Sequence, residues 1–271
     1  MPEPPFSVDG LRIVIIGGTT GLGLSAARAL VAGGASVVIV GRSADSMDRA
    51  VDTLAAPERV RGARGDATDP STADTAVALA VSEFGALDAL YHVAGGSGRS
   101  RGDGPLHELS DNGLAYTLDL NLRSLVFSNR AAVRQFRCQD PAGRGGAILN
   151  MGSVLGHSPS PAFFGSHAYA ACKSAAVGFT RSVAAYYAKD NIRANVIAPA
   201  LVETPMSERA SNDLAIQSFI RSKQPLQGGR NGWASDLDAA ALLLLSPAGA
   251  WITGQVLSVD GGWSVTEGQT P

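Results

Sequence analysis

Short apolar runs rich in β-branched residues alternate along the chain with longer alanine-rich stretches whose apolar residues have helical spacing. This βαβα order predicts an α/β fold: a Rossmann-type, doubly wound parallel sheet with helices on both faces, in a single domain. We predict strands over residues 12–16, 36–40, 60–64, 87–93, 147–151, 193–197 and 256–259, and helices over 22–32, 44–55, 71–84, 110–137, 167–188 and 236–245.

Three irregular stretches, residues 95–105, 155–166 and 202–232, each follow a predicted strand. In a doubly wound sheet such loops surround the ligand crevice, and we expect residues 202–232 to form a helical lid over a substrate. Residues 1–10 lack the basic and apolar regions of a signal peptide, so we predict a flexible leader there and one domain over residues 11–265.

The composition supports a large buried core, because 45% of the 271 residues are apolar and only 17% are charged. A net charge of −2 argues against a nucleic-acid-binding or anionic-membrane-binding surface. Two cysteines and the absence of an apolar run of about 18 residues favour a cytoplasmic protein with neither a disulfide framework nor a membrane span.

A glycine-rich turn, Gly17-Gly18-Thr19-Thr20-Gly21-Leu22-Gly23, joins the first predicted strand to the first predicted helix. Glycines here allow a tight turn, close approach of the backbone to a pyrophosphate, and close packing of the helix, whose free N–H groups then face the phosphates. A tight turn without a ligand is the alternative. We predict cofactor contacts from Gly17, Thr19, Thr20, Gly21, Leu22 and Gly23.

Tyr169 and Lys173 are four residues apart in a predicted helix, so both side chains leave the same face. A free phenol has a pKa near ~10 and exchanges protons poorly at pH 7, whereas a neighbouring ammonium group lowers that pKa. A decrease of roughly 3 units needs about 4 kcal/mol. Alone, the pair could be a chance feature of an exposed helix face.

From residue 11 to residue 263 the sequence resembles the short-chain dehydrogenase/reductase (SDR) family. The resemblance rests on the glycine-rich turn, the Tyr-x-x-x-Lys helix, Gly152-Ser153-Val154, Asn121 within Asp119-Leu120-Asn121-Leu122, and the ending between Ile252 and Gly262. It implies an NAD(P)(H)-dependent oxidoreductase that interconverts a small-molecule ketone and a secondary alcohol without a metal ion.

The resemblance assigns catalytic roles to Asn121, Ser153, Tyr169 and Lys173. Tyr169 would exchange the proton, Lys173 would lower its pKa, and Ser153 would bind the substrate oxygen. Asn121, in a helix that the resemblance implies to be kinked, would hold a water linked to Lys173 in a proton relay. Ser153 could instead only cap a turn, and Asn121 could be a helix-surface amide. A nucleotide-binding regulator and an SDR acting on C=C bonds or by dehydration are the rival functions.

Arg42 follows the second strand, where Gly41 replaces the acidic residue of many NAD-preferring relatives. A guanidinium suits a 2′-phosphate, so we favour NADP(H) over NAD(H), although Arg42 could simply be solvated and Thr20 is not the basic residue of a second NADP marker. By resemblance, further cofactor contacts come from Ser43, Asp66, Ala67, His92, Ala94, Gly95, Tyr169, Lys173, Pro199, Val202 and Thr204.

Several positions depart from the family pattern, among them His92 in place of an asparagine and about three extra residues between Ser153 and Tyr169. Phe163, Phe164, Met206 and Leu214 are candidates for the substrate walls. Arg99 and Arg101 could bind an anionic group, but we expect them to point to water. The resemblance also favours a homotetramer, with a dimer as the alternative, formed by the helices at 110–137 and 167–188 and by a surface containing Trp251, Ile252 and Trp263.

Overall fold

A parallel sheet of seven strands organises the part of the chain that the computed structural model describes, residues 6–139 and 144–268. The strand order is β3-β2-β1-β4-β5-β6-β7, so the chain moves outward from β1 on one side and from β4 on the other. This reversal confirms the predicted doubly wound sheet and creates a crevice at the carboxyl ends of β1 and β4. The strands are β1 (Arg12–Ile16), β2 (Ser36–Gly41), β3 (Val60–Arg64), β4 (Ala89–His92), β5 (Gly146–Met151), β6 (Ile192–Pro199) and β7 (Val256–Val259).

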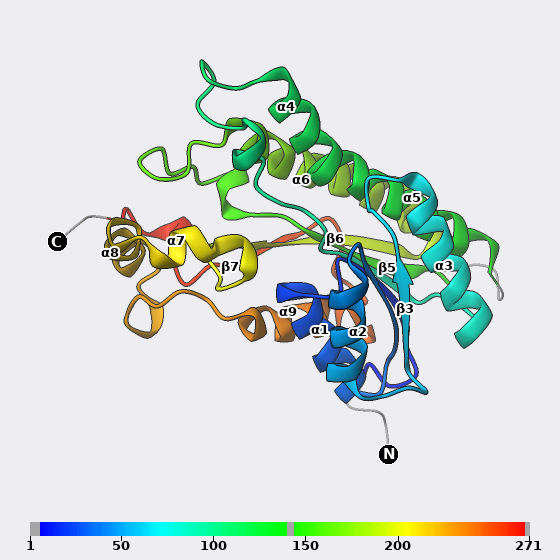
Figure 1. The fold of residues 1–271 in the computed structure, drawn as a ribbon. Coiled ribbons are helices and arrows are strands. Elements are labelled where there is room, and N and C mark those ends of the chain that lie inside the picture. Colours follow the sequence, from blue (N-terminus) through cyan, green and yellow to red (C-terminus); the bar gives the residue numbers. More distant parts are fainter. Residues whose placement is uncertain (1–5, 140–143, 269–271) are drawn as a thin grey trace.

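Helices cover both faces of the sheet (Figure 1). Successive residues of β1 point to opposite faces: Ile13 and Ile15 belong to one buried apolar cluster, and Val14 and Ile16 to another. The first cluster packs against α1 (Gly21–Ala32), α2 (Ala44–Leu54) and α9 (Asp238–Leu245), and the second against α3 (Pro70–Phe84), α5 (Ser124–Cys138) and α6 (His167–Tyr187).

The continuous helix predicted over residues 110–137 is wrong, because a wider π-helical turn interrupts it. Helix α4 (Asp111–Leu118) leads into the π turn η2 (Asp119–Arg123), and α5 begins at Ser124. A π turn inserts one residue and shifts the register of the side chains that follow, and such turns are frequent at functional sites.

The segment predicted as a lid leaves the sheet after β6. It contains α7 (Glu208–Asn212) and α8 (Leu214–Lys223), which lie beyond the sheet in Figure 1. Val202 and Gly232 form a parallel β-bridge that joins its two ends. The segment is therefore a helical insertion whose two ends are held together. Its closure over a substrate stays a prediction.

Part of the predicted flexible leader is packed. Residues 1–5 lie outside the described residues, but Val8 is only 2% exposed and belongs to the core cluster beside α1. None of the helices in the described residues combines the length and apolar character that crossing a bilayer requires.

Candidate active site

The glycine-rich turn has the close contacts that its sequence predicts. A Cβ atom on Gly17 would lie 2.7 Å from the Ala94 nitrogen, and one on Gly23 would lie 2.0 Å from the Gly17 carbonyl oxygen. Thr20, the N-cap of α1, makes no side-chain capping bond, and the first turn holds no acidic residue. Its N–H groups are therefore free to bind an anion, and the turn fits the pyrophosphate of a dinucleotide.

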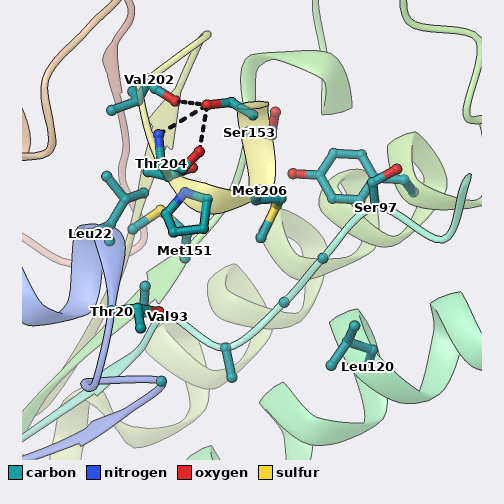
Figure 2. A pocket seen from close by; sticks show the side chains of 18 of the residues that line it. Thr20, Leu22, Val93, Ser97, Leu120, Met151, Ser153, Val202, Thr204 and Met206 are labelled. Atoms are coloured by element: carbon teal, nitrogen blue, oxygen red, sulfur yellow. Dashed lines mark hydrogen bonds between the residues drawn. The ribbon is translucent and has the colours of Figure 1, made fainter. Parts of the chain in front are cut away.

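One cavity of about 860 Å³ opens at the carboxyl ends of the strands (Figure 2). It brings together nearly all the predicted site residues, from the ends of six different strands, the segments that follow them, and α6. These lining residues are Gly17, Thr19, Thr20, Gly21, Leu22, Arg42, Ser43, Asp66, Ala67, Ala94, Gly95, Ser153, Tyr169, Lys173, Pro199, Val202 and Thr204.

Tyr169 and Lys173 face each other on α6, with the Lys173 nitrogen 5.4 Å from the centre of the phenol ring. Lys173 is 3% exposed and its nitrogen donates to the Met151 carbonyl oxygen at 2.9 Å. This bond anchors the amine to the end of β5, directly beside the cavity.

Burial controls the acidity of both groups. It raises the pKa of Tyr169 to about 12, against a smaller lowering by a hydrogen bond with Ser153, and it lowers the pKa of Lys173 to about 8. The expected decrease in the Tyr169 pKa is therefore absent from this structure, because desolvation of the phenolate outweighs the hydrogen bond with Ser153.

An asparagine in the π turn positions the loop after β4. Asn121 is 1% exposed; its amide nitrogen donates to the carbonyl oxygens of Gly96 (2.9 Å) and Thr117 (3.0 Å), and its oxygen accepts from the Gly96 N–H (3.0 Å). Both the Asn121 oxygen and the Lys173 nitrogen lie against Gly95. Lys173 lines the cavity, whereas Asn121 lies behind Gly95 in the cavity wall. Asn121 is therefore not a helix-surface amide.

Ser153 combines the two roles that its sequence context left open. Its hydroxyl caps a short turn by accepting from the Leu155 N–H at 3.2 Å, and the residue also lines the cavity beside Tyr169. Its hydrogen bond with Tyr169 favours the phenolate. The side chain can therefore hold a ligand oxygen next to the phenol.

The predicted contact from His92 is not supported by its position. Its ring is buried between β4 and the following helices, 2.8 Å from the Ser128 hydroxyl and 3.4 Å from the Ser124 hydroxyl. Burial and the charge of Lys173 lower its pKa to about 3, so the ring is neutral at pH 7. His92 braces β4 behind the cavity, and Gly23 likewise lies outside it because its role is to let α1 approach the turn.

The end of the cavity near β2 carries positive charge from Arg42, which lies 3.9 Å from the Asp66 carboxylate. A Cβ atom on Gly41 would lie 2.5 Å from Thr19, so an acidic side chain at position 41 would have to displace that threonine. Ser43 is the N-cap of α2 and accepts from the Ser46 N–H at 3.4 Å.

At the base of the lid, backbone groups are held in place by one serine. The Ser207 hydroxyl donates to the carbonyl oxygens of Val202 (2.6 Å) and Thr204 (3.0 Å) and accepts from the Thr204 N–H (2.9 Å). Figure 2 shows Val202 and Thr204 side by side at the cavity wall. Thr204 lies against the glycine-rich turn, where a Cβ atom on Gly21 would be 3.4 Å from its side chain.

The substrate end differs from the expected one. Phe164 and Met206 line the cavity as predicted, but Leu214 is exposed and Phe163 packs against Phe219 beside a second cavity. Trp263, predicted as a subunit contact, is buried and lines the site. Sequence reasoning also missed Tyr116, Leu120 and Arg209; the helical spacing of Tyr116 and Leu120, one turn apart, was the available signal.

Arg99 lines the cavity, whereas Arg101 lies over the Tyr116 ring, with its guanidinium carbon 5.4 Å from the ring centre. Arg99 is exposed to solvent, as expected, and also borders the cavity. Within the described residues, no cluster of three or more His, Cys, Asp or Glu side chains could hold a metal ion.

Comparison with known proteins places this geometry in a family. A family model described as enoyl-(acyl carrier protein) reductase matches residues 17–264. Gluconate 5-dehydrogenase of Gluconobacter oxydans is 32% identical over 262 residues, which are 96% of this chain and 97% of that protein. A short-chain type dehydrogenase/reductase from Mycobacterium ulcerans superposes with a TM-score of 0.86 at 29% identity, covering 95% of this chain and 91% of that one.

The chain belongs to the short-chain dehydrogenase/reductase family. Another similar structure is a 3-ketoacyl-(acyl-carrier-protein) reductase from Brucella melitensis complexed with NADH, with a TM-score of 0.83 at 27% identity and coverage of 96% and 100%. The protein is therefore an oxidoreductase of a family that uses NAD(P)(H), and the glycine-rich turn with its free N–H groups fits that cofactor.

Proposed function

We propose that this SDR reduces a ketone to a secondary alcohol, and catalyses the reverse oxidation, with NADP(H) as the preferred cofactor. The observation that carries the proposal is the meeting of Tyr169, Ser153 and Lys173 in the same cavity as the glycine-rich turn. When bound, the nicotinamide supplies the hydride, and the protein supplies orientation and the proton.

Tyr169 acts as the general acid in reduction. Because burial raises its pKa to about 12, the phenol is fully protonated at pH 7 and can donate its proton to a substrate oxygen held by Ser153. Lys173, next to it on α6, has a pKa of about 8. Its ammonium form can return a proton to the phenolate that remains after Tyr169 has donated. Asn121, behind Gly95, would link the amine to solvent.

The preference for NADP(H) rests on Arg42 and on the crowding around Gly41. Arg42 lines the cavity and is exposed, so its guanidinium can bind a 2′-phosphate with charge-assisted hydrogen bonds. The contact between position 41 and Thr19 leaves no room for the carboxylate that would favour NAD(H).

The remaining predictions concern the assembly and its location. A cytoplasmic location stays part of the proposal. A homotetramer, with a dimer as the alternative, is supported by the 99% exposure of Trp251 and by the exposed side of α6. Trp263 is buried and cannot take part in a subunit contact. The contact surface predicted from the sequence is therefore reduced to Trp251, Ile252, helix α6 and the helices α4 and α5 on either side of the π turn.

The test is a Tyr169→Phe variant assayed by NADPH absorbance with a panel of ketones and with crotonyl-CoA as an enoyl contrast. Loss of a general acid should lower kcat about 10²–10⁴-fold while NADPH binding, measured by fluorescence, is kept. Tyr186→Phe, on the exposed part of the same helix, is the matched control and should keep full turnover. Unchanged kcat in Tyr169→Phe, or turnover of crotonyl-CoA alone, would contradict the proposal.

A further inference from the structure

Two arginines border both the catalytic cavity and a second cavity of about 510 Å³ beside it. Arg99 lies in the short 3-10 helix η1 (Arg99–Arg101) that follows β4, and Arg209 lies in α7 of the lid segment. Residues more than a hundred positions apart thus meet where the two cavities join, and one of them belongs to the lid.

The two positive charges face each other with little compensation. Burial and then the charge of Arg209 lower the pKa of Arg99. Arg99 makes one weak hydrogen bond, at 3.4 Å, to the Phe163 carbonyl oxygen. Over residues 6–139 and 144–268, no ion pair joins either guanidinium to a carboxylate. Two like charges left in this position favour a ligand of opposite charge between them.

The acidic residues around the second cavity are engaged elsewhere. Asp103 accepts from the N–H groups of Ala168 and Tyr169 at the start of α6. Asp213 accepts from two N–H groups at the start of α8, and Glu108 lies 3.6 Å from His107. These carboxylates keep their charge, and that of Asp103 partly offsets Arg99. All three line the second cavity and none lines the catalytic cavity, so a ligand carboxylate would meet the two arginines from the catalytic side.

We propose that the substrate is a keto acid or hydroxy acid whose carboxylate binds to Arg99 and Arg209 while its carbonyl or hydroxyl group reaches Ser153 and Tyr169. The inference rests on the proposed function. A guanidinium offers paired N–H donors that match the two oxygens of a carboxylate, so each arginine can bind one. The cavity lining also includes apolar Leu155, Phe164 and Met206, which suits a carbon skeleton that carries both groups.

Binding of the carboxylate would also join the lid to the body of the protein. Arg209 belongs to the lid segment, whereas Arg99 follows β4 of the sheet. An anion held by both links the two segments, so an acidic substrate closes its own site. A neutral analogue leaves the two cations facing each other and gains no such link.

The test compares 4-oxocyclohexanecarboxylate with its methyl ester, which differ only in the charge. Wild type, Arg99→Met, Arg209→Met and Arg101→Met are assayed with NADPH, and the ratio of kcat/KM for acid over ester is compared. Arg101 is the matched control because its guanidinium lies over Tyr116 and lines neither cavity. We expect a ratio of at least about 10 in wild type, a fall of about tenfold or more in Arg99→Met and Arg209→Met, and no change in Arg101→Met.

A binding experiment separates failure of this inference from failure of the proposed reaction. Calorimetry in the presence of NADPH compares cyclohexanecarboxylate with cyclohexanecarboxamide. Selective binding of the acid that is lost in both arginine variants supports the anion site even without turnover. Failure of wild type to bind the acid overturns the inference. So does an equal decrease of kcat/KM for the acid and for the ester in the arginine variants. Preference for acetoacetyl-CoA with loss of that activity in the variants would assign the arginines to a phosphate and overturn the carboxylate.

Discussion

Single residues at the cavity act through burial as much as through charge. Lys173 and Tyr169 lie together on α6, yet desolvation raises the pKa of the phenol and lowers that of the amine. The phenol is consequently a proton donor in this structure, which matches the reducing direction. Alcohol oxidation needs the phenolate, so its rate should depend on pH more steeply than that of reduction.

The proposed choice of cofactor depends on a single residue, Arg42. We expect Arg42→Ala to raise the KM for NADPH about tenfold or more, because a charge-assisted hydrogen bond to the 2′-phosphate is lost, and to change the KM for NADH little. Initial rates over a range of each cofactor measure the effect.

Arg49→Ala is the matched control for Arg42→Ala, since Arg49 is an exposed arginine of α2 outside the cavity. An equal rise in the KM for both cofactors would show that Arg42 contacts the adenosine that they share and does not bind the 2′-phosphate of NADPH. No rise with NADPH would remove Arg42 from cofactor binding altogether.

At the scale of elements, the first turn of α6, the helix that carries Tyr169, is capped by a residue from a loop far away in the sequence. Ser166, the N-cap of α6, makes no side-chain capping bond. Instead the Asp103 carboxylate, 3% exposed, accepts from the N–H groups of Ala168 (3.1 Å) and Tyr169 (3.0 Å). The loop after β4 therefore fixes the first turn of the helix that carries the phenol.

Asp103→Ala should lower the free energy of unfolding by about 1–3 kcal/mol, since two buried N–H groups lose their charged acceptor. It should also lower kcat, because Tyr169 is the second residue capped. Urea denaturation and steady-state rates measure the two effects.

Asp69→Ala removes the N-cap of α3, away from the cavity, and should lower stability without lowering kcat. Asp103→Asn keeps one acceptor and should recover part of both losses. If Asp103→Ala and Asp69→Ala had the same kcat, the capping bond would have no role in positioning Tyr169.

The order and approximate bounds of the helices and strands could be predicted from the sequence. The interruption of the helix predicted over residues 110–137 could not be predicted from its apolar spacing. Strands at residues 12–16, 60–64 and 256–259 have the predicted bounds because glycine, proline or aspartate residues on either side limit their length. Apolar spacing continues on both sides of the π turn at Asn121 and does not reveal it; only the family resemblance, which implies a kinked helix there, pointed to it. Likewise, the meeting of Arg99 with Arg209 depends on how the lid folds back, which local periodicity does not encode.

For the whole molecule, the catalytic lysine makes stability depend on pH. Its pKa is lowered from the ordinary 10.5 to about 8, so between these values the unfolded chain holds a proton that the folded protein has released. Stability therefore rises with pH across this window, and below pH 8 the penalty is constant.

We expect the free energy of unfolding of wild type, relative to Lys173→Met, to increase by about 2 kcal/mol from pH 7 to pH 9.5. Urea denaturation of both proteins at the two pH values measures this difference. The upper limit stays below pH 10 because the raised pKa of Tyr169 acts in the opposite direction above that value. A difference that does not change with pH would mean that Lys173 is not desolvated in the folded protein.

The bridge between Val202 and Gly232 has a consequence for how new specificities arise in this molecule. Glu203 N–H donates to the Gly232 carbonyl oxygen at 2.8 Å and Gly232 N–H to the Leu201 carbonyl oxygen at 2.9 Å, so the excursion starts and finishes at one spot. Because both ends are fixed there, we expect exposed positions of α7 and α8 to vary without altering the register of any strand. Selection can thus rewrite substrate choice, Arg209 included, while Tyr169 and Lys173 keep their geometry.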